Sequence, residues 1–209
     1  MLVVERFDRR VAPDGTWLMR LPQEDFCQVE GCSPLRKYES EGGPGLMALF
    51  TTLRQSVNAD ADMRTLVAAQ ILFWLLRAPD GHAKNFSIRI LPRGRFHLTR
   101  LYDVRSAWPV LGTGTHQWSS REITLSMALL GRNRHYGMQT VQRRHFNSTA
   151  RQVGYGPTAE PLIEDILART PAAIAAVQAE LPPDFPPHVA QSILGGLEQA
   201  AAALAAMEH

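Results

Sequence analysis

The sequence predicts a mainly α-helical fold with a β-hairpin, and three observations support this prediction. Apolar residues recur at helical spacing from Leu46 onward and again over residues 61–77. Four later segments are also typical of helices: 122–131, 138–153, 158–180 and 186–207. Residues 86–101, in contrast, alternate around the four-residue turn Pro92-Arg93-Gly94-Arg95, which indicates a β-hairpin.

The amino-terminal elements follow from local turn chemistry. Residues 2–7 and 16–21 flank Pro13-Asp14-Gly15, so we expect two strands joined by a turn. Residues 21–31 predict a short helix that ends at Gly31. The sequence "KYESEGGPG", residues 37–45, is polar and glycine-rich and predicts a loop.

The helix predicted over residues 61–77 has the pattern most typical of a buried helix. One face carries Leu66, Val67, Ile71, Trp74 and Leu75, and the segment becomes apolar nearly all round toward its end. We therefore expect the helix and Trp74 to be buried, with Pro79 preventing its continuation. The last two helices are alanine-rich, and Leu197, Leu204 and Met207 can dock the tail.

Composition excludes several classes of protein. The chain has 209 residues, 45% hydrophobic and 20% charged, which fits one globular core. A formal net charge of +2 argues against a general nucleic-acid binder. No apolar run suggests a membrane span and no signal peptide is evident, so a cytoplasmic protein is expected. Cys27 and Cys32 suffice neither for a disulfide framework nor for a zinc site.

The stretch that carries chemistry is "DGHAKN", residues 80–85. Asp80 and Asn85 have the spacing D-x-x-x-x-N of a kinase catalytic loop, in which a carboxylate orients the attacking hydroxyl and an amide oxygen binds Mg²⁺. Asp103 follows the hairpin and could bridge metal and phosphates. Lys84 could neutralise charge on the transferred phosphoryl group.

A structural interpretation stays open beside the chemical one. Asp80 could cap a helix, Asn85 could hold a turn and Asp103 could simply be solvated at a strand end. The order buried helix, loop, hairpin and aspartate is nevertheless the order that a kinase large lobe requires. It favours the chemical interpretation.

Eight blocks of the sequence together resemble the HipA-type serine/threonine kinases of bacterial toxin–antitoxin systems. They are "LVVERFDRR", "RLPQEDFCQ", "KYESEGGPG", "DGHAKNFS", "LYDVRSA", "PVLGTGTH", "RRHF" and "LPPDFP", and they run in order along nearly the whole chain. The resemblance implies a protein-kinase-like large lobe of the HipA C-terminal type over residues 1–209, with a hinge and hairpin at 1–22, a catalytic loop and metal site at 61–105, and a helical subdomain at 121–209.

The resemblance also implies roles for individual residues. It makes Asp80 the catalytic aspartate and Asn85 and Asp103 the Mg²⁺ ligands. ATP would be contacted by His82 and Tyr102, with Glu5 and Phe7 forming the hinge at the adenine. From the residues alone, His82 could equally bond a nearby backbone carbonyl. Pro79 departs from the small polar residue usual in the family, which puts the fine geometry of the loop in doubt.

The implied partners are a small helix-turn-helix antitoxin of the HipB type and a protein substrate, in the family an aminoacyl-tRNA synthetase. The family's amino-terminal lobe has no counterpart before Glu5, so we expect an incomplete kinase that needs a small lobe, either encoded elsewhere or lost by truncation. The alternative is a non-catalytic remnant that binds antitoxin or DNA. The arginine-rich segment 121–151 is expected to be mainly a solvated basic face, with DNA contact only weakly indicated.

Overall fold

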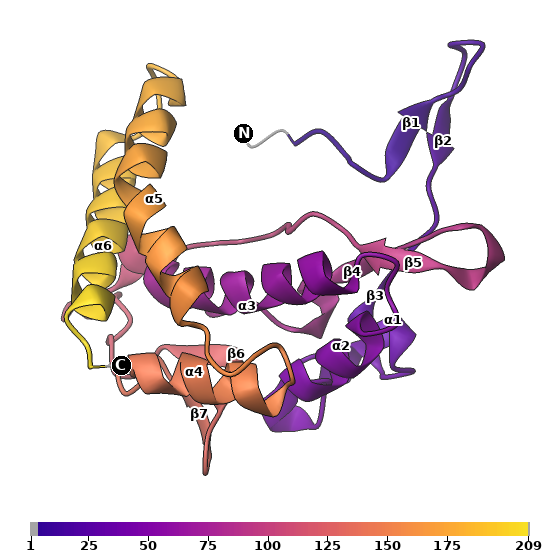
Figure 1. The fold of residues 1–209 in the computed structure, drawn as a ribbon. Helices are drawn as coiled ribbons and strands as arrows, with labels where there is room; N and C mark the ends of the chain where they lie inside the picture. The colour runs from indigo at the N-terminus through magenta and orange to yellow at the C-terminus, as the bar shows by residue number, and fades with distance from the viewer. Residues whose placement is uncertain (1–3, 209) are drawn as a thin grey trace.

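Helix α3 (Ala59–Leu76) runs through the middle of the molecule in the computed structural model, which describes residues 4–208. Helices α5 (Glu160–Glu180) and α6 (Pro187–Ala205) stand as a pair at one end of α3 (Figure 1). At the other end, strands β1 (Arg9–Val11) and β2 (Leu18–Arg20) form a projecting hairpin. The fold is mixed α/β.

Two further antiparallel sheets cover α3. The first has the order β3 (Gln23–Asp25), β4 (Ser87–Ile90), β5 (Phe96–Leu98), and the second pairs β6 (Thr124–Leu130) with β7 (Arg134–Gly137). The remaining helices are α1 (Phe26–Val29), α2 (Leu46–Leu53) and α4 (Arg143–Gln152). Short 3₁₀ turns occur at Pro34–Arg36, Glu39–Glu41, Ala83–Asn85, Pro92–Gly94 and Trp108–Val110.

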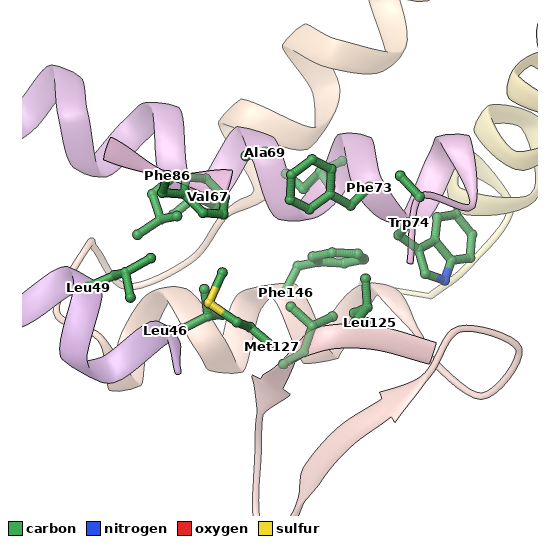
Figure 2. Close-up of a cluster of buried hydrophobic side chains, with 14 of the residues drawn as sticks. Leu46, Leu49, Val67, Ala69, Phe73, Trp74, Phe86, Leu125, Met127 and Phe146 are labelled. Carbon is green, nitrogen blue, oxygen red and sulfur yellow. The ribbon is translucent and has the colours of Figure 1, made fainter. Parts of the chain in front are cut away.

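The core lies where α2, α4 and β6 pack against α3 (Figure 2). Phe146 of α4 sits between α3 and β6, and its ring meets Trp74 edge-on at 6.3 Å between centroids. Trp74 is 2% exposed, and its indole N–H donates to the Met138 carbonyl at 2.7 Å. The predicted burial of Trp74 is confirmed, and its only polar group is satisfied.

The expected helix over residues 122–131 is wrong, because Thr124–Leu130 is strand β6. Every residue from Leu125 to Leu130 is buried, so the segment lacks the alternation that reveals a half-exposed strand. The expected helix over 138–153 begins later, at Arg143. The region 121–209 is therefore a β-hairpin followed by helices, and the fold holds more strand than the sequence predicted.

The amino-terminal expectations need two corrections. The first expected strand, residues 2–7, lies partly outside the described residues, and residues 4–7 form no strand; the pairing starts at Arg9. The expected helix over 21–31 is instead strand β3 followed by α1. Asp25 ends the strand and caps the helix, because its side chain accepts from the Gln28 backbone N–H at 3.0 Å.

Other expectations are confirmed. The hairpin within residues 86–101 forms around Pro92–Gly94, α3 ends before Pro79, and α5 and α6 match the last two expected helices. In the described part of the chain, no helix is both long and apolar enough to cross a membrane.

Candidate active site

Loop 79–85 leaves the end of α3 through a tightly fixed backbone. Arg77 adopts the left-handed conformation (φ 50°) that ends the helix, and the Ala78 N–H donates back to the Phe73 carbonyl at 2.8 Å. A Cβ at Gly81 would lie 2.2 Å from the Phe73 ring, so only glycine lets the loop pass this close. The Ser126 hydroxyl of β6 donates to the Pro79 carbonyl. The loop is therefore held by both α3 and β6.

Asn85 closes the loop onto Asp80. Its side-chain N–H donates to the Asp80 carbonyl at 2.6 Å, and its backbone N–H donates to the His82 carbonyl at 2.8 Å. Asn85 is 7% exposed. Because the amide nitrogen is used inside the loop, the amide oxygen is the atom of Asn85 suited to bind a ligand.

The Asp80 carboxylate is held on both oxygens. Oδ1 accepts from the Tyr38 hydroxyl at 2.9 Å, and Oδ2 accepts from the Arg105 guanidinium at 3.1 Å. The Tyr38 pKa is raised, by burial first and then by this hydrogen bond to Asp80. Tyr38 therefore stays protonated and donating, which fixes the direction of the carboxylate.

Tyr38 owes its position to the glycine-rich loop over residues 37–45. The neighbouring Glu39 is 9% exposed and anchors the loop to the second sheet, accepting from the Ala128 N–H at 2.6 Å and from Arg134 at 2.7 Å. A Cβ at Gly43 would lie 2.2 Å from a backbone carbonyl, which explains the glycine there. The contact of Glu39 with β6 thus positions Tyr38 beside the Asp80 side chain.

Asp103 reaches the same place from the other direction. Its backbone has φ 55°, a left-handed conformation that aspartate tolerates better than most residues. The chain just beyond is fixed to the end of α3, because Ser106 donates to the Leu76 carbonyl at 2.6 Å and the Ala107 N–H to the Arg77 carbonyl at 3.0 Å.

Arg105 joins the two carboxylates. Its guanidinium lies 3.1 Å from Asp80 Oδ2 and 3.1 Å from Asp103 Oδ1. The two acidic side chains, 23 positions apart in the sequence (80 and 103), therefore face one another across a single cation.

His82 makes no hydrogen bond to a backbone carbonyl, and its contact with a nucleotide stays a prediction. Its Nε2 lies 3.3 Å from Asp80 Oδ1, but the geometry is not that of a hydrogen bond, and both ring nitrogens are buried without a hydrogen-bond partner. The Tyr38 ring meets it edge-on at 5.1 Å. Burial lowers the His82 pKa more strongly than the Asp80 carboxylate raises it, so the ring is neutral at pH 7.

Lys84 turns away from the two aspartates. Its ammonium lies 2.8 Å from Asp25 Oδ2, and this hydrogen bond raises the Lys84 pKa. Its backbone carbonyl accepts from the Tyr102 hydroxyl at 2.7 Å. In this structure Lys84 ties loop 79–85 to the start of α1.

Three of the five expected nucleotide contacts, Glu5, Phe7 and Tyr102, line one cavity of about 560 Å³ together with Asp103, whereas His82 and Lys84 do not line it. The Phe7 and Tyr102 rings lie 5.8 Å apart. The Phe7 carbonyl, which was expected to lie at the hinge, already accepts from Arg89 at 2.8 Å and is therefore engaged within the chain. Asp80 and Arg105 instead line a second, larger cavity of about 1200 Å³ with Tyr38 and Trp118.

The donor atoms of Asn85 and Asp103 are of the kind that Mg²⁺ binds. Asn85 and Asp103 offer an amide oxygen and a carboxylate, the hard oxygen donors that Mg²⁺ prefers. Within residues 4–208 no group of three or more histidines, cysteines or acidic residues is arranged to hold a metal. A Mg²⁺ ion here would depend on substrate oxygens and water to complete its coordination, as is usual for that ion.

The arginines of segment 121–151 are mainly exposed, as the sequence predicted, with Arg143 as the buried exception. Arg143 is 1% exposed and pairs with Glu160 and Glu164 of α5, and Arg134 pairs with Glu39. Arg121, Arg132, Arg144 and Arg151 are exposed, and so is Arg134 despite its ion pair. Most of this positive charge therefore faces solvent.

Sequence reasoning missed three residues of the site: Tyr38, Arg105 and Asp25. Each contacts a distant part of the chain, so no local spacing marks it. The one available signal was the glycine pattern in residues 37–45, which indicated a backbone packed closely against something else.

Comparisons with known proteins identify relatives of this site and fold. The family model described as the HipA-like C-terminal domain matches residues 1–174. A protein of Sinorhizobium fredii named "Putative kinase Y4mE" is 39% identical over 128 residues, 60% of this chain and 30% of that protein. The "Serine/threonine-protein kinase toxin HipA" of Shewanella oneidensis is 35% identical over 120 residues, 50% of this chain and 27% of that protein.

A solved structure shares the fold. It is the complex of HipA, HipB and operator DNA from Shewanella oneidensis, matched with a TM-score of 0.80 and 24% identity over 96% of this chain and 48% of that chain. The matched segments thus span less than half of each relative. Because the family model covers most of the residues described here, the chain belongs to the HipA-like C-terminal domain family.

Proposed function

We propose that the chain is the large lobe of an ATP- and Mg²⁺-dependent serine/threonine protein kinase of the HipA type. The observation that carries the proposal is the meeting of Asp80 and Asp103 on the two sides of Arg105, with Asn85 bonded to the Asp80 backbone. These are the oxygen-bearing side chains that phosphoryl transfer needs, in the order in which kinases present them. The kinase names of the relatives support the same conclusion.

Each residue has a role in this proposal. Asp80, aimed by Tyr38, would orient the acceptor hydroxyl and take its proton. Asn85 and Asp103 would hold Mg²⁺, which supplies neutralisation of the phosphate charge. The cavity at Glu5, Phe7 and Tyr102 would take the adenosine.

His82 and Lys84 would act at the edge of the nucleotide site. Because the His82 ring is neutral and its nitrogens lack partners within the described residues, it can donate one hydrogen bond to a bound nucleotide without a charge change. Lys84 would have to leave Asp25 before it could reach a phosphate.

The partners are proposed from the relatives. The Shewanella HipA is seen with HipB and operator DNA, so a HipB-like antitoxin is the first partner to test. The resemblance to the family adds a protein substrate, an aminoacyl-tRNA synthetase, and a small lobe that would complete the nucleotide site.

The test is a segment exchange. This chain replaces the matched segment of the Shewanella HipA, and phosphoryl transfer from radiolabelled ATP is measured. Transfer should depend on Mg²⁺, and Asp80→Asn should lower its rate by about 10²–10⁴-fold, the usual worth of a general base. Asp184→Asn, an exposed position far along the chain, is the control. Transfer that is unchanged by Asp80→Asn would refute the assignment.

A further inference from the structure

We propose that Arg105 is a built-in cation that occupies the metal side of Asp103 in the free chain and competes with the divalent ion for it. This inference rests on the proposed function, because it concerns the same metal site. Arg105 directly follows Asp103-Val104, and the proposed function gives it no role.

The geometry is that of a bridge between functional groups. The Arg105 guanidinium uses Nε for Asp103 Oδ1 and Nη2 for Asp80 Oδ2, both at 3.1 Å. Its side chain is 69% exposed, so the position is set by the two carboxylates and not by packing. An oxygen of Asp103 that faces this guanidinium cannot bind a metal ion unless two cations share it.

The charges around the site make Arg105 the compensating group. Lys84 is paired with Asp25, and His82 is held neutral by burial. With Arg105 in place, Asp80 and Asp103 carry a summed charge of −1 together with it (−1 −1 +1). Without it they carry −2, which attracts a dication more strongly.

Arg105 also contacts a residue that lines each of the two cavities. Arg105 and Asp80 line the larger cavity, whereas Asp103 lines the smaller one that holds the expected nucleotide contacts. The ion pair between Arg105 and Asp103 therefore links the linings of the two cavities. Displacement of Arg105 by metal would break this link.

The competition must be moderate. Exposed ion pairs contribute little because water screens them and the long side chain loses freedom when it is held. Removing the Arg105 charge should therefore tighten metal binding by roughly three- to tenfold, and not by orders of magnitude. Arg105 would act as a threshold on the metal concentration at which the site fills.

The experiment measures metal affinity directly. Mn²⁺ is titrated into the chain at saturating ADP, and free Mn²⁺ is followed by electron paramagnetic resonance. Arg105→Gln removes the positive charge, and Asp103→Asn removes the proposed metal ligand. Arg105→Lys keeps the charge but cannot contact Asp80 and Asp103 through two separate nitrogen atoms. Arg169→Gln on α5 is the matched control, since Arg169 is also exposed and faces a carboxylate, Asp165, at 3.7 Å.

We expect Arg105→Gln to bind Mn²⁺ more tightly than the unchanged chain, with the affinity of Arg105→Lys between the two. Arg169→Gln should bind Mn²⁺ as the unchanged chain does. Asp103→Asn should bind Mn²⁺ poorly. Mn²⁺ should also raise the melting temperature of Arg105→Gln more than that of the unchanged chain. Equal or weaker Mn²⁺ binding by Arg105→Gln, with the Asp103→Asn loss intact, would overturn this inference alone. Absence of Asp103-dependent binding in all variants would overturn the metal site of the proposed function with it.

Discussion

Loop 79–85 and the β1–β2 hairpin both border the candidate site, but the fold treats them in opposite ways. The loop is held by Ser126, by Phe73 against Gly81, and by its own hydrogen bonds. The hairpin projects from the body (Figure 1) and leaves large apolar side chains in water, with Val11 59%, Trp17 57% and Leu18 60% exposed.

This difference separates two tasks. The groups proposed for chemistry are set in place by the chain itself before any ligand binds, which is what preorganised catalysis requires. The groups proposed to hold adenosine lie next to the β1–β2 hairpin, which leaves three large apolar side chains exposed to water. Stability should therefore depend strongly on the first region and weakly on the second.

The largest effect is expected at Trp74, which supports the helix that leads into the loop. Trp74→Ala leaves a cavity against Phe146 and removes the bond to the Met138 carbonyl, so it should lower the free energy of unfolding by about 3–5 kcal/mol. Urea denaturation measures this. Trp118→Ala, at a position 54% exposed, is the control. A loss below about 1 kcal/mol for Trp74→Ala would contradict the architecture described here.

The next effect concerns the passage of the loop past α3. Gly81→Ala places a methyl group 2.2 Å from the Phe73 ring, and such overpacking typically costs about 1–3 kcal/mol. Gly195→Ala in α6 is the matched control, because nothing lies within 4 Å of its added Cβ and alanine favours a helix. Equal denaturation midpoints for the two variants would show that the loop is not packed as described.

Mild acid should destabilise the core of the fold and not the β1–β2 hairpin, because residues 4–21 contain no histidine that would titrate in this pH range. Burial, His135 and Arg144 lower the pKa of His145 below its ordinary 6.5. The unfolded chain therefore binds a proton here first, so stability is present above pH 6.5 and falls as the pH drops below it.

His145→Gln tests this pH dependence without removing the helix cap. His145 Nδ1 accepts from the Gln142 N–H at 3.0 Å, and glutamine at this position can accept the same bond. Melting temperatures between pH 7.5 and 5 should fall less steeply for His145→Gln than for the unchanged chain. Parallel curves would assign the acid sensitivity to other groups.

The smallest effect on stability is expected in the β1–β2 hairpin. Trp17→Ser should change the free energy of unfolding by no more than about 0.5 kcal/mol, because the side chain is already mostly in water. The same urea denaturation used for Trp74 measures it. A loss comparable to that of Gly81→Ala would show that the hairpin is part of the cooperative core.

The sequence predicted the helical framework where one face is apolar, as in α3, and the β4–β5 hairpin where apolar residues alternate. It failed at Thr124–Leu130, because a fully buried strand rich in leucine, methionine and alanine looks like a buried helix. Periodicity carries no information when every position is buried.

The candidate site divides in the same way. The spacing of Asp80 and Asn85, and the position of Asp103 after the hairpin, were visible because they follow chain order. Tyr38 and Arg105 were not, because a contact between residues 42 or 25 positions apart depends on the tertiary fold. Likewise the ion pair between Lys84 and Asp25 depends on strand β3, where the sequence predicted a helix.

The left-handed backbone at Asp103 has a consequence for how this position can change over generations. Glycine and asparagine also accept φ 55°, whereas a β-branched residue would be strained. A mutational library at this codon should therefore yield well-folded chains with Gly or Asn that have lost the carboxylate. Such chains would keep the fold but lose the proposed metal ligand, so the identity of residue 103 would separate chains that can hold the metal ion from chains that cannot.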